Sequence, residues 1–407
     1  MSVSNTVPRI RFPQFESNWS NYDFGDLVDL FLGLTYTPNY VEHGVPFLSV
    51  KDLGGGKISF AKTRFISNEE FNKSTANSKP KKGDVIYGRV GTLGSPVVLE
   101  NEKDFCIFVS LGFFRVKENT YYNYFLKYWM ESPQFWKQVR IQVAGSSQKN
   151  LNTGWLKKFK LSMPSYEEQK KISNFLMITD KKIEKLQKKL NLLQSYRQSS
   201  LLQVFSQGIR FKNYRNSVFP NWKDERVDYF VEKASEPVDV KPDKTYREIG
   251  VRSHGKGVFH KEEIKGHELG NKRVFWLHPD AFVVNIVFAW EHAVAKTSDQ
   301  EIGFIASHRF PMFIPKNDRV DIRFFTLFFL SKRGKHLLGL ASPGGAGRNK
   351  TLGQSNFAEL KVSFPSLEEQ IKIADFYEAF DKKIKLVEKQ IVQTQTFKKG
   401  LLQQLYV

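Results

Sequence analysis

The sequence has little cysteine: only Cys106, which lies between Phe105 and Ile107, occurs in its 407 residues. A lone thiol in an apolar run can form neither an intrachain disulfide nor a zinc site built from several cysteines, so we expect it in the core. Long apolar runs are also lacking, since the longest, 281–290, is interrupted by Asn285 and is too short to span a bilayer. The N-terminus lacks the charged and then apolar pattern of a signal peptide. We therefore expect a cytoplasmic protein with no membrane partner.

Acidic residues are scarce relative to basic ones. The chain has 42 Asp and Glu against 62 Lys and Arg, which gives a formal net charge of +20. Such an excess favours a polyanionic partner, most simply nucleic acid. Charge alone does not distinguish DNA, RNA and a membrane surface, and a basic protein without any such partner is the alternative.

Motifs for catalysis or cofactor binding are missing. The glycines of Gly88 to Gly94 are wrongly spaced for a dinucleotide-binding loop, and Asn349 replaces the glycine that precedes the lysine of a phosphate-binding loop. No Pro-Pro pair occurs, which excludes the Asp/Asn-Pro-Pro-aromatic loop that holds the target base in amino-methyltransferases. Pro242-Asp243 with 263–265 loosely matches a metal-dependent nuclease, but Pro-Asp predicts a turn. We expect no catalytic residue, no metal and no cofactor in this chain.

What the sequence does contain is an internal repeat. The segment LSMPSYEEQ at 161–169 returns 201 residues later as VSFPSLEEQ at 362–370, and the same offset relates DKKI at 180–183 to DKKI at 381–384. A weaker repeat, Ile-Arg-Phe followed by a tryptophan, opens each half of the chain. The chain is therefore two copies of one unit, each a variable block followed by the repeated segment.

Each copy of the repeated segment predicts a long helix. Pro164 and Pro365 end the preceding strand, the next serine can cap the helix, and glutamates in the first turn suit the helix dipole. Apolar residues then recur alternately four and three apart, which is the spacing of a coiled-coil seam. At 1.5 Å per residue each helix is about 60 Å long and needs a partner, so we expect the two helices to pack antiparallel. The expected seam consists of Ile183, Leu186, Leu190, Ile384, Val387 and Ile391.

The two variable blocks, about 30–152 and 231–353, resemble each other only in outline. Each has an apolar strand opened by an acidic turn, at 82–87 and 278–284, and then a second apolar strand. Short strands, Gly-rich turns and one or two helices predict mixed α+β domains. An aromatic segment at helical spacing follows in each block, and we expect it to form one buried face. These aromatic residues are Tyr121, Tyr124, Phe125, Tyr128, Trp129, Phe324, Phe325, Phe328 and Phe329.

Basic and amide side chains gather in Gly-bearing loops of each block, and the loops 145–151 and 346–352 align at the same offset. Glycine lets the backbone approach phosphate, Lys and Arg supply charge, and Asn, Gln and Arg can form paired hydrogen bonds with base edges in the major groove. A solvated turn has the same composition, so both interpretations stay open at each residue. The candidate DNA-binding residues are Lys81, Lys82, Arg89, Gln148, Lys149, Asn150, Arg252, His254, Lys256, Arg348, Asn349 and Lys350.

Over nearly its whole length the chain resembles the specificity subunit of a Type I restriction-modification system. The resemblance rests on the two repeated helix openings, on Gly83-Asp84-Val85-Ile86 with its Arg89-Val90-Gly91 continuation, and on the Phe-Pro and Trp residues that open each unit. The second block departs from the pattern, because it has Pro279-Asp280 in place of Gly-Asp and no Arg-x-Gly after it.

The resemblance implies an α+β fold with two pseudo-two-fold-related mixed α/β target-recognition domains, separated by two long antiparallel helices that form a coiled coil. It implies domain boundaries at 1–160 for the first recognition domain, 161–207 for the first spacer helix, 208–360 for the second recognition domain and 361–407 for the second spacer helix.

The resemblance further implies a protein without catalytic activity that binds a bipartite target in double-stranded DNA, one half-site per domain. It implies two methyltransferase subunits and two restriction subunits as partners, with S-adenosylmethionine, ATP and Mg bound by those partners. Two alternatives differ in class. A stand-alone DNA methyltransferase or nuclease would bind S-adenosylmethionine or metal itself, and a coiled-coil scaffold would show no salt-dependent affinity for DNA.

Overall fold

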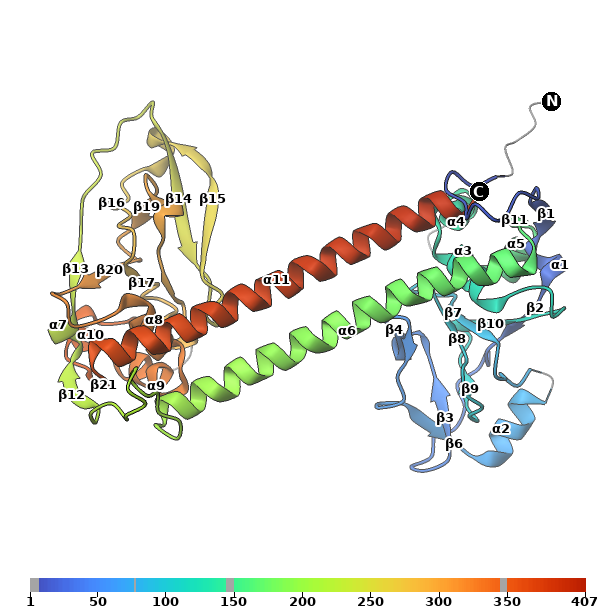
Figure 1. The fold of residues 1–407 in the computed structure, drawn as a ribbon, viewed down its shortest axis with the longest axis horizontal. Helices are drawn as coiled ribbons and strands as arrows, with labels where there is room; N and C mark the ends of the chain where they lie inside the picture. Colours follow the sequence, from blue (N-terminus) through green and yellow to red (C-terminus); the bar gives the residue numbers. More distant parts are fainter. Residues whose placement is uncertain (1–6, 77, 144–149, 345–349) are drawn as a thin grey trace. The chain divides into compact units, whose positions relative to one another are not determined.

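The computed structural model describes residues 7–76, 78–143, 150–344 and 350–407. The chain divides into two compact units, unit 1 (residues 1–188 and 389–407) and unit 2 (residues 189–388), and the elements of each can be followed in Figure 1. Each of the two long helices therefore contributes one part to unit 1 and the other part to unit 2. Among the described residues, no helix is long and apolar enough to cross a membrane.

Unit 1 contains a four-stranded sheet with the order β2-β10-β7-β8, in which all neighbouring strands are antiparallel. A three-stranded sheet has the order β6-β3-β9, with β3 and β9 parallel, and β1 pairs with β11 at the base of the long helix. The elements are β1 (Ser20–Asp23), α1 (Phe24–Leu27), β2 (Val28–Leu32), β3 (Val45–Leu48), β4 (Leu53–Gly54), β5 (Lys57–Ile58), β6 (Arg64–Ile66), α2 (Asn68–Thr75), β7 (Val85–Gly88), β8 (Gly94–Val98), β9 (Cys106–Ile107), β10 (Leu111–Val116), α3 (Asn123–Glu131), α4 (Pro133–Val143), α5 (Thr153–Lys157), β11 (Lys160–Met163) and α6 (Tyr166–Phe205).

Unit 2 repeats this topology, with one strand, β16, added to its second sheet. Its antiparallel sheet has the order β13-β20-β17-β18, its second sheet has the order β15-β14-β19-β16 with β14 and β19 parallel, and β12 pairs with β21. The elements are β12 (Lys223–Arg226), α7 (Val227–Phe230), β13 (Val231–Ala234), β14 (Thr245–Val251), β15 (Val258–Lys265), β16 (Val274–Trp276), β17 (Phe282–Val284), the 3-10 helix η3 (Ala289–Glu291), β18 (Val294–Lys296), β19 (Ile305–Ser307), β20 (Met312–Pro315), α8 (Ile322–Leu330), α9 (Lys332–Leu340), α10 (Gln354–Ala358), β21 (Lys361–Phe364) and α11 (Leu367–Leu405).

The strand pairs expected from the sequence are confirmed. The strands after the two acidic turns, β7 and β17, take the same place in their sheets, and so do the second apolar strands, β9 and β19. The blocks share a fold although their sequences agree only in outline. These strands are apolar and buried on both faces, a requirement that many different apolar residues meet. Cys106, on β9, is buried as expected, and its burial raises the pKa of the thiol to about 11.

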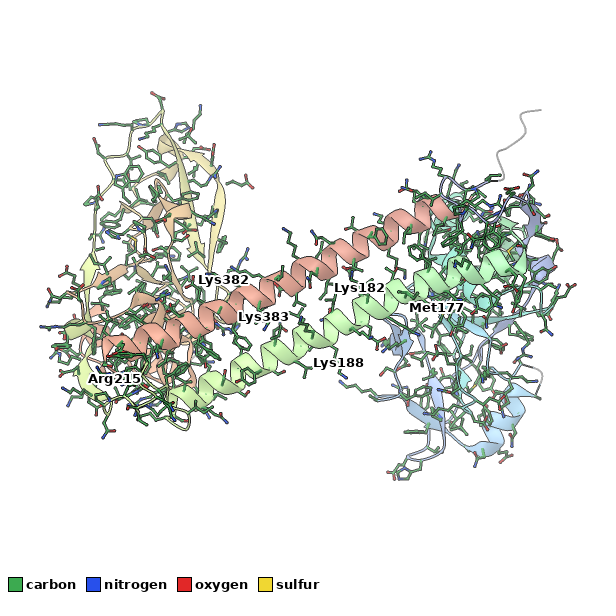
Figure 2. The ribbon with its side chains drawn as sticks, viewed as in Figure 1. Met177, Lys182, Lys188, Arg215, Lys382 and Lys383 are labelled. Atoms are coloured by element: carbon green, nitrogen blue, oxygen red, sulfur yellow. The ribbon has the colours of Figure 1, made fainter. Side chains whose placement is uncertain are left out.

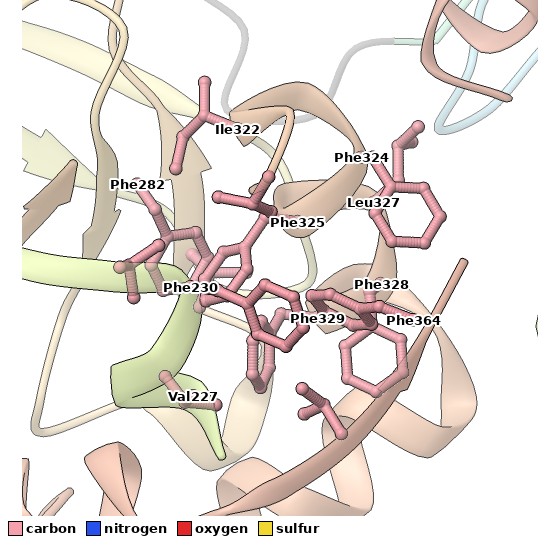
Figure 3. Packing of buried hydrophobic residues seen from close by; sticks show 14 of the residues in the cluster. Val227, Phe230, Phe282, Ile322, Phe324, Phe325, Leu327, Phe328, Phe329 and Phe364 are labelled. Atoms are coloured by element: carbon pink, nitrogen blue, oxygen red, sulfur yellow. The ribbon is translucent and has the colours of Figure 1, made fainter. Parts of the chain in front are cut away.

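The aromatic segments form the cores of the two units. In unit 2, Phe324, Phe325, Phe328 and Phe329 of α8 are all fully buried, and Figure 3 shows them packed with Phe282 and Phe364. The spacing predicted a single buried face, but every residue of α8 from Phe324 to Phe329 is buried. The prediction failed there because α8 is covered by a sheet, by α9 and by β21 and the end of α6, so no side faces water. In unit 1, Phe125, Tyr128 and Trp129 of α3 have the same role.

The long helices α6 and α11 pack antiparallel, as expected. In unit 2 the end of α6 contacts the start of α11: Ser200 accepts a hydrogen bond from Tyr377 at 3.2 Å, and Arg197 binds Asp381 through two hydrogen bonds of 2.5 and 2.9 Å. In unit 1 the start of α6 contacts the end of α11, where Lys398 pairs with Asp180 at 2.6 Å. The offset of 201 residues relates Asp180 to Asp381 and Arg197 to Lys398, so the same ion pair occurs once in each unit.

The ion pair of unit 1 lies in a partly buried cluster. Burial alone would lower the pKa of Lys398, but the carboxylates of Glu131 and Asp180 raise it above its ordinary value. Burial would likewise raise the pKa of Asp180, and the ammonium groups of Lys127 and Lys398 outweigh it and lower that pKa. Both groups therefore stay charged at neutral pH, which fixes the register of the two helices at this point.

The burial pattern of both helices follows the predicted coiled-coil spacing. In the middle of each helix the side chains that are not fully exposed recur every three or four residues, from Ile183 to Ser200 on α6 and from Ile384 to Lys398 on α11. Toward the ends, where the helices pack against the two units, a wider face is buried. Of the six proposed seam residues, Leu190, Val387 and Ile391 are buried. The other three, Ile183, Leu186 and Ile384, are half-buried. Their pairing across the seam stays a prediction.

The repeated Glu-Glu-Gln joins each helix to its unit. Glu168 is 1% exposed and binds Arg11 through two hydrogen bonds of 2.8 Å, and the equivalent pair in unit 2 is Glu369 with Arg210. The next residue, Gln169, accepts a hydrogen bond from the backbone N–H of Tyr122 at 2.8 Å, which ties α6 to the start of α3. The sequence suggested a role with the helix dipole, but the second glutamate of each motif is an anchor for the arginine that opens the unit.

The end of α11 and the residue that follows it complete the core of unit 1. Leu401, Leu405 and Tyr406 are buried among the aromatic residues of α3. The Tyr406 hydroxyl donates a hydrogen bond of 3.0 Å to the carbonyl oxygen of Phe125. In unit 2, Leu201 and Phe205 at the end of α6 occupy the equivalent place. The hydrophobic core of each unit therefore includes the C-terminal end of a helix that begins in the other unit.

Candidate nucleic-acid interface

In unit 1 a tight turn presents Lys81 and Lys82 to solvent. Asp84, which is 1% exposed, accepts a hydrogen bond from the Lys81 backbone N–H at 2.8 Å and binds Arg115 of β10 through hydrogen bonds of 2.8 and 2.7 Å. This contact raises the pKa of Arg115. Gly83 has a positive φ of 92°, which favours glycine. Within the described residues, neither lysine side chain forms an ion pair with a carboxylate, so both ammonium groups can contact phosphate.

Arg89, in contrast, points into the protein. It is 9% exposed, and its guanidinium donates to the carbonyl oxygens of Leu151 and Val109, both at 3.1 Å. The backbone N–H of Leu151 in turn donates to the Arg89 carbonyl oxygen at 2.9 Å. Arg89 thus holds the end of the candidate loop 145–151 against β7. This geometry gives Arg89 a supporting role, because it positions Leu151 and the adjacent Asn150, which is half-buried and forms a β-bridge with Val90. A contact of Arg89 with DNA stays a prediction.

We expect Arg89→Met and Lys82→Met to separate anchoring from DNA contact. Arg89→Met leaves two carbonyl oxygens without donors and should lower the free energy of unfolding by about 1–3 kcal/mol. Lys82→Met should leave stability unchanged and should reduce the slope of log affinity for DNA against log salt by about one. Chemical denaturation and DNA binding at several salt concentrations measure both. Unchanged stability with weakened DNA binding in Arg89→Met would show that Arg89 contacts DNA directly.

In unit 2 the turn between β14 and β15 brings three candidate residues together. Arg252, His254 and Lys256 are all exposed in this turn, which the Arg252 N–H closes by donating to the Gly257 carbonyl oxygen at 3.0 Å. His254 has φ 61° and Gly255 has φ 66°, both in the left-handed region. The N–H groups of these two residues donate to the carbonyl oxygens of Glu291 and His292, at 2.7 and 2.9 Å. The turn is therefore fixed against the segment around η3.

The same segment adjoins Lys350. The Lys350 ammonium lies 5.9 Å from the centre of the Trp290 ring, on η3. The imidazole of His292 lies beneath the turn, where burial and the nearby Lys335 lower its pKa. The turn that carries three candidates and the separate candidate Lys350 thus both contact residues 289–292. No local sequence pattern marks Trp290 or His292, because such a pattern does not predict which loop a hairpin turn will contact.

Four of the proposed residues, Gln148, Lys149, Arg348 and Asn349, lie outside the described residues. Their neighbours Asn150 and Lys350 are described, and the structure leaves the role of both as a proposal. The Asp243 segment of the loose nuclease pattern is a turn, as expected. Among the residues that the structure describes, no three His, Cys, Asp or Glu side chains are grouped so as to hold a metal ion.

The departure from the Gly-Asp pattern in unit 2 has a structural explanation. The strand registers align Val85 with Phe282, so Asp280 takes the place of Gly83 and Ala281 takes the place of Asp84. Asp280 shares the positive φ of Gly83, and its exposed side chain pairs with Lys296. The hydrogen bonding that the Asp84 carboxylate supplies in unit 1 comes in unit 2 from Thr297, a fully buried residue on the neighbouring segment. The Thr297 hydroxyl accepts from the Ala281 N–H at 2.9 Å and donates to the His278 carbonyl oxygen at 2.7 Å. The turn is thus kept without a buried charge, and so without the arginine that such a charge needs.

The long helices also carry exposed lysines. Lys182 and Lys188 on α6, and Lys382 and Lys383 on α11, are exposed, and Figure 2 shows these side chains on the two helices. The repeat places Lys181-Lys182 and Lys382-Lys383 at equivalent positions. These lysines add to the positive charge of both units without forming part of either candidate loop.

Two repeated α+β units built on an antiparallel helix pair are the architecture of a Type I specificity subunit. The crystal structure of the S subunit of a Type I restriction-modification system from M. genitalium has this fold, with a TM-score of 0.57 at 14% identity over 98% of this chain and 99% of that one. A chain solved in work on complex assembly and conformational transition of the type I R-M system also has a TM-score of 0.57, at 12% identity, covering 96% of this chain and 97% of that chain.

The family model for the Type I restriction modification DNA specificity domain matches residues 16–195 and 281–395. The chain therefore belongs to this family and is the non-catalytic specificity component of a Type I restriction-modification enzyme, with two target-recognition domains. It is 21% identical to the Type I restriction enzyme MjaVIII specificity subunit of Methanocaldococcus jannaschii, over 97% of this chain and 92% of the relative. Membership in this family contradicts the alternative of a stand-alone methyltransferase or nuclease.

Proposed function

We propose that the protein binds a bipartite target in double-stranded DNA, with one half-site read by each unit. The observation that carries this proposal is the repeated topology of the two units, each of which presents exposed basic side chains in a fixed turn: Lys81 and Lys82 in unit 1, and Arg252, His254 and Lys256 in unit 2. Two copies of one fold with different loop sequences suit two different half-sites. Phosphate contacts would position each unit, and amide and guanidinium groups would read base edges.

We further propose that the chain recruits two methyltransferase subunits and two restriction subunits, which hold S-adenosylmethionine, ATP and Mg. Equivalent exposed residues on the two long helices favour two equivalent docking positions for a partner. Tyr196 on α6 and Phe397 on α11 are related by the offset of 201 residues, and each is 54% exposed. Exposed aromatic side chains are enriched at protein interfaces. One such residue in each unit favours the binding of two copies of the same partner. Because these partners act on DNA, we also propose a cytoplasmic location.

The test is DNA binding by the complex of this chain with its methyltransferase subunits. Mapping methylated adenines in host DNA identifies the target, and binding to that duplex is then measured against salt. If four to eight phosphates are contacted, log affinity should fall against log salt with a slope of about −4 to −7. A scaffold without a DNA role predicts affinity that depends on neither salt nor sequence.

A further inference from the structure

Unit 2 contains a cavity of about 160 Å³ where its two sheets meet. Lys233 and Ala234 of β13 and Met312 of β20 come from one sheet, and Phe275 of β16 comes from the other. Among the strands that the structure describes in unit 1, none is equivalent to β16: the second sheet of unit 1 has three strands where that of unit 2 has four. Among the described strands, the cavity is thus built on an addition to the shared topology.

The cavity combines an apolar floor with a basic rim. The floor consists of four buried or half-buried apolar side chains, those of Phe275, Ile286, Phe310 and Met312. The rim consists of three exposed basic side chains, those of Lys233, Arg273 and His308. Within the described part of unit 2, none of these three basic side chains forms an ion pair or a hydrogen bond to a carboxylate. Two cations and an imidazole gathered without a negative charge repel each other and favour an anion in their midst.

Backbone hydrogen bonds hold the walls of the cavity in place. The His308 N–H donates to the Arg273 carbonyl oxygen at 3.1 Å, which keeps two of the basic side chains adjacent. The Ile286 N–H donates to the Arg309 carbonyl oxygen at 3.0 Å, and the Leu352 N–H donates to the Ile286 carbonyl oxygen at 2.8 Å. A binding site held in this way loses little conformational entropy when it is filled.

The lining points to one class of ligand. An inorganic anion alone would be held by charges and N–H groups and would gain nothing from four apolar side chains. An uncharged ring would gain nothing from the basic rim. A cavity of roughly 150 Å³ accommodates a six-membered aromatic ring. The Gln354 side chain, also in the lining, can donate and accept hydrogen bonds at a ring edge.

We propose that this cavity binds a single nucleotide, with its base over the apolar floor and its phosphate at Lys233, Arg273 and His308. The nucleotide is either unstacked from the DNA that unit 2 binds or free in solution, and the first source rests on the proposed function. Unstacking one base costs a few kcal/mol, which stacking on Phe275 or Phe310 would offset.

The first arm of the test measures binding to the full chain by titration calorimetry, with dAMP, dTMP, inorganic phosphate and thymidine as probes. We expect one nucleotide per chain, bound at least tenfold more tightly than either phosphate or the nucleoside. Arg273→Gln should weaken binding at least tenfold. Ser235→Phe, which fills the opening without removing charge, should abolish it. Arg309→Gln removes the same charge from a neighbouring exposed residue outside the lining and is the matched control, with affinity unchanged.

The second arm distinguishes the two sources. The mapped target duplex carries 2-aminopurine at successive positions of the half-site read by unit 2 and is bound by the complex with methyltransferase subunits. A rise in fluorescence that Ser235→Phe removes would assign the nucleotide to DNA. No rise, together with dAMP binding that DNA does not affect, would assign it to a free nucleotide.

The proposal is overturned if phosphate binds as tightly as the nucleotides, if Ser235→Phe leaves nucleotide binding intact, or if neither arm gives a signal. In each case the affinity of the wild-type complex for the duplex is measured in parallel. Intact duplex binding with no nucleotide signal would remove only the cavity proposal, whereas loss of specific duplex binding would contradict the proposed function.

Discussion

Replacing residues 30–152 by the equivalent block of another specificity subunit is expected to change one half of the DNA target and to leave the other half as it was. The described strands of this block pair only within unit 1, and the block carries Lys81, Lys82 and Asn150. Unit 2 has its own sheets and its own turn at Arg252–Gly257. The half-site read by unit 2 should therefore be unaffected.

The exchanged block must keep the side chains that contact the helices. Glu131 binds Lys398, Tyr128 donates to Asp180, and the Tyr122 N–H donates to Gln169. The matched exchange of residues 231–353 should alter only the other half-site. Methylation mapping in cells that carry each exchange gives the result. A change in both halves from one exchange would show that the units do not read DNA independently.

A paired insertion of four residues, after Leu193 in α6 and near Ile384 in α11, is expected to lengthen the non-specific spacer between unchanged half-sites by one or two base pairs. Four residues add about 6 Å at 1.5 Å per residue, against about 3.4 Å per base pair. They turn the apolar face by only about 40°, so the seam can persist. Because the two insertions lie opposite each other, they preserve the ion pairs of Arg197 with Asp381 and of Lys398 with Asp180.

A paired insertion of two residues is the control, because it turns the apolar face by about 200° and should abolish activity. The spacer is again measured by methylation mapping. An unaltered spacer with activity retained after the four-residue insertion would show that loops, and not the helices, set the distance between half-sites. An insertion in α6 alone should be less well tolerated. It changes the separation of Asp180 and Arg197 on α6 but not that of Asp381 and Lys398 on α11, so both ion pairs cannot form at once.

The sequence predicted the repeated elements well and the contacts of the loops poorly. The helices and the seam spacing follow from periodicity, and Asp84 and Asp280 mark equivalent strands, because these signals are local or repeat at one offset. The inward orientation of Arg89 depends on two carbonyl oxygens supplied by Val109 and Leu151, which are far away in sequence. A basic residue in a Gly-rich loop has the same sequence signature whether it faces solvent or a buried carbonyl.

The basic rim of the cavity has no signature in the sequence, for a related reason. Lys233, Arg273 and His308 belong to three separate segments, and each alone resembles an ordinary surface residue. Only the meeting of the two sheets, with β16 as the added strand, brings them together. The extra strand could not be inferred from unit 1, because the repeat does not include it.

The burial of Tyr406 in unit 1 has a consequence for how the chain is made. Unit 2 is formed by one continuous stretch, residues 189–388, whereas unit 1 needs residues 389–407 as well. The hydrogen bond from Tyr406 to Phe125 joins residues 281 positions apart. At about 5–20 residues per second, the ribosome needs roughly 15 to 55 s to synthesise that interval. The half translated first is thus expected to reach its native state last, with the apolar side of α3 exposed to chaperones meanwhile.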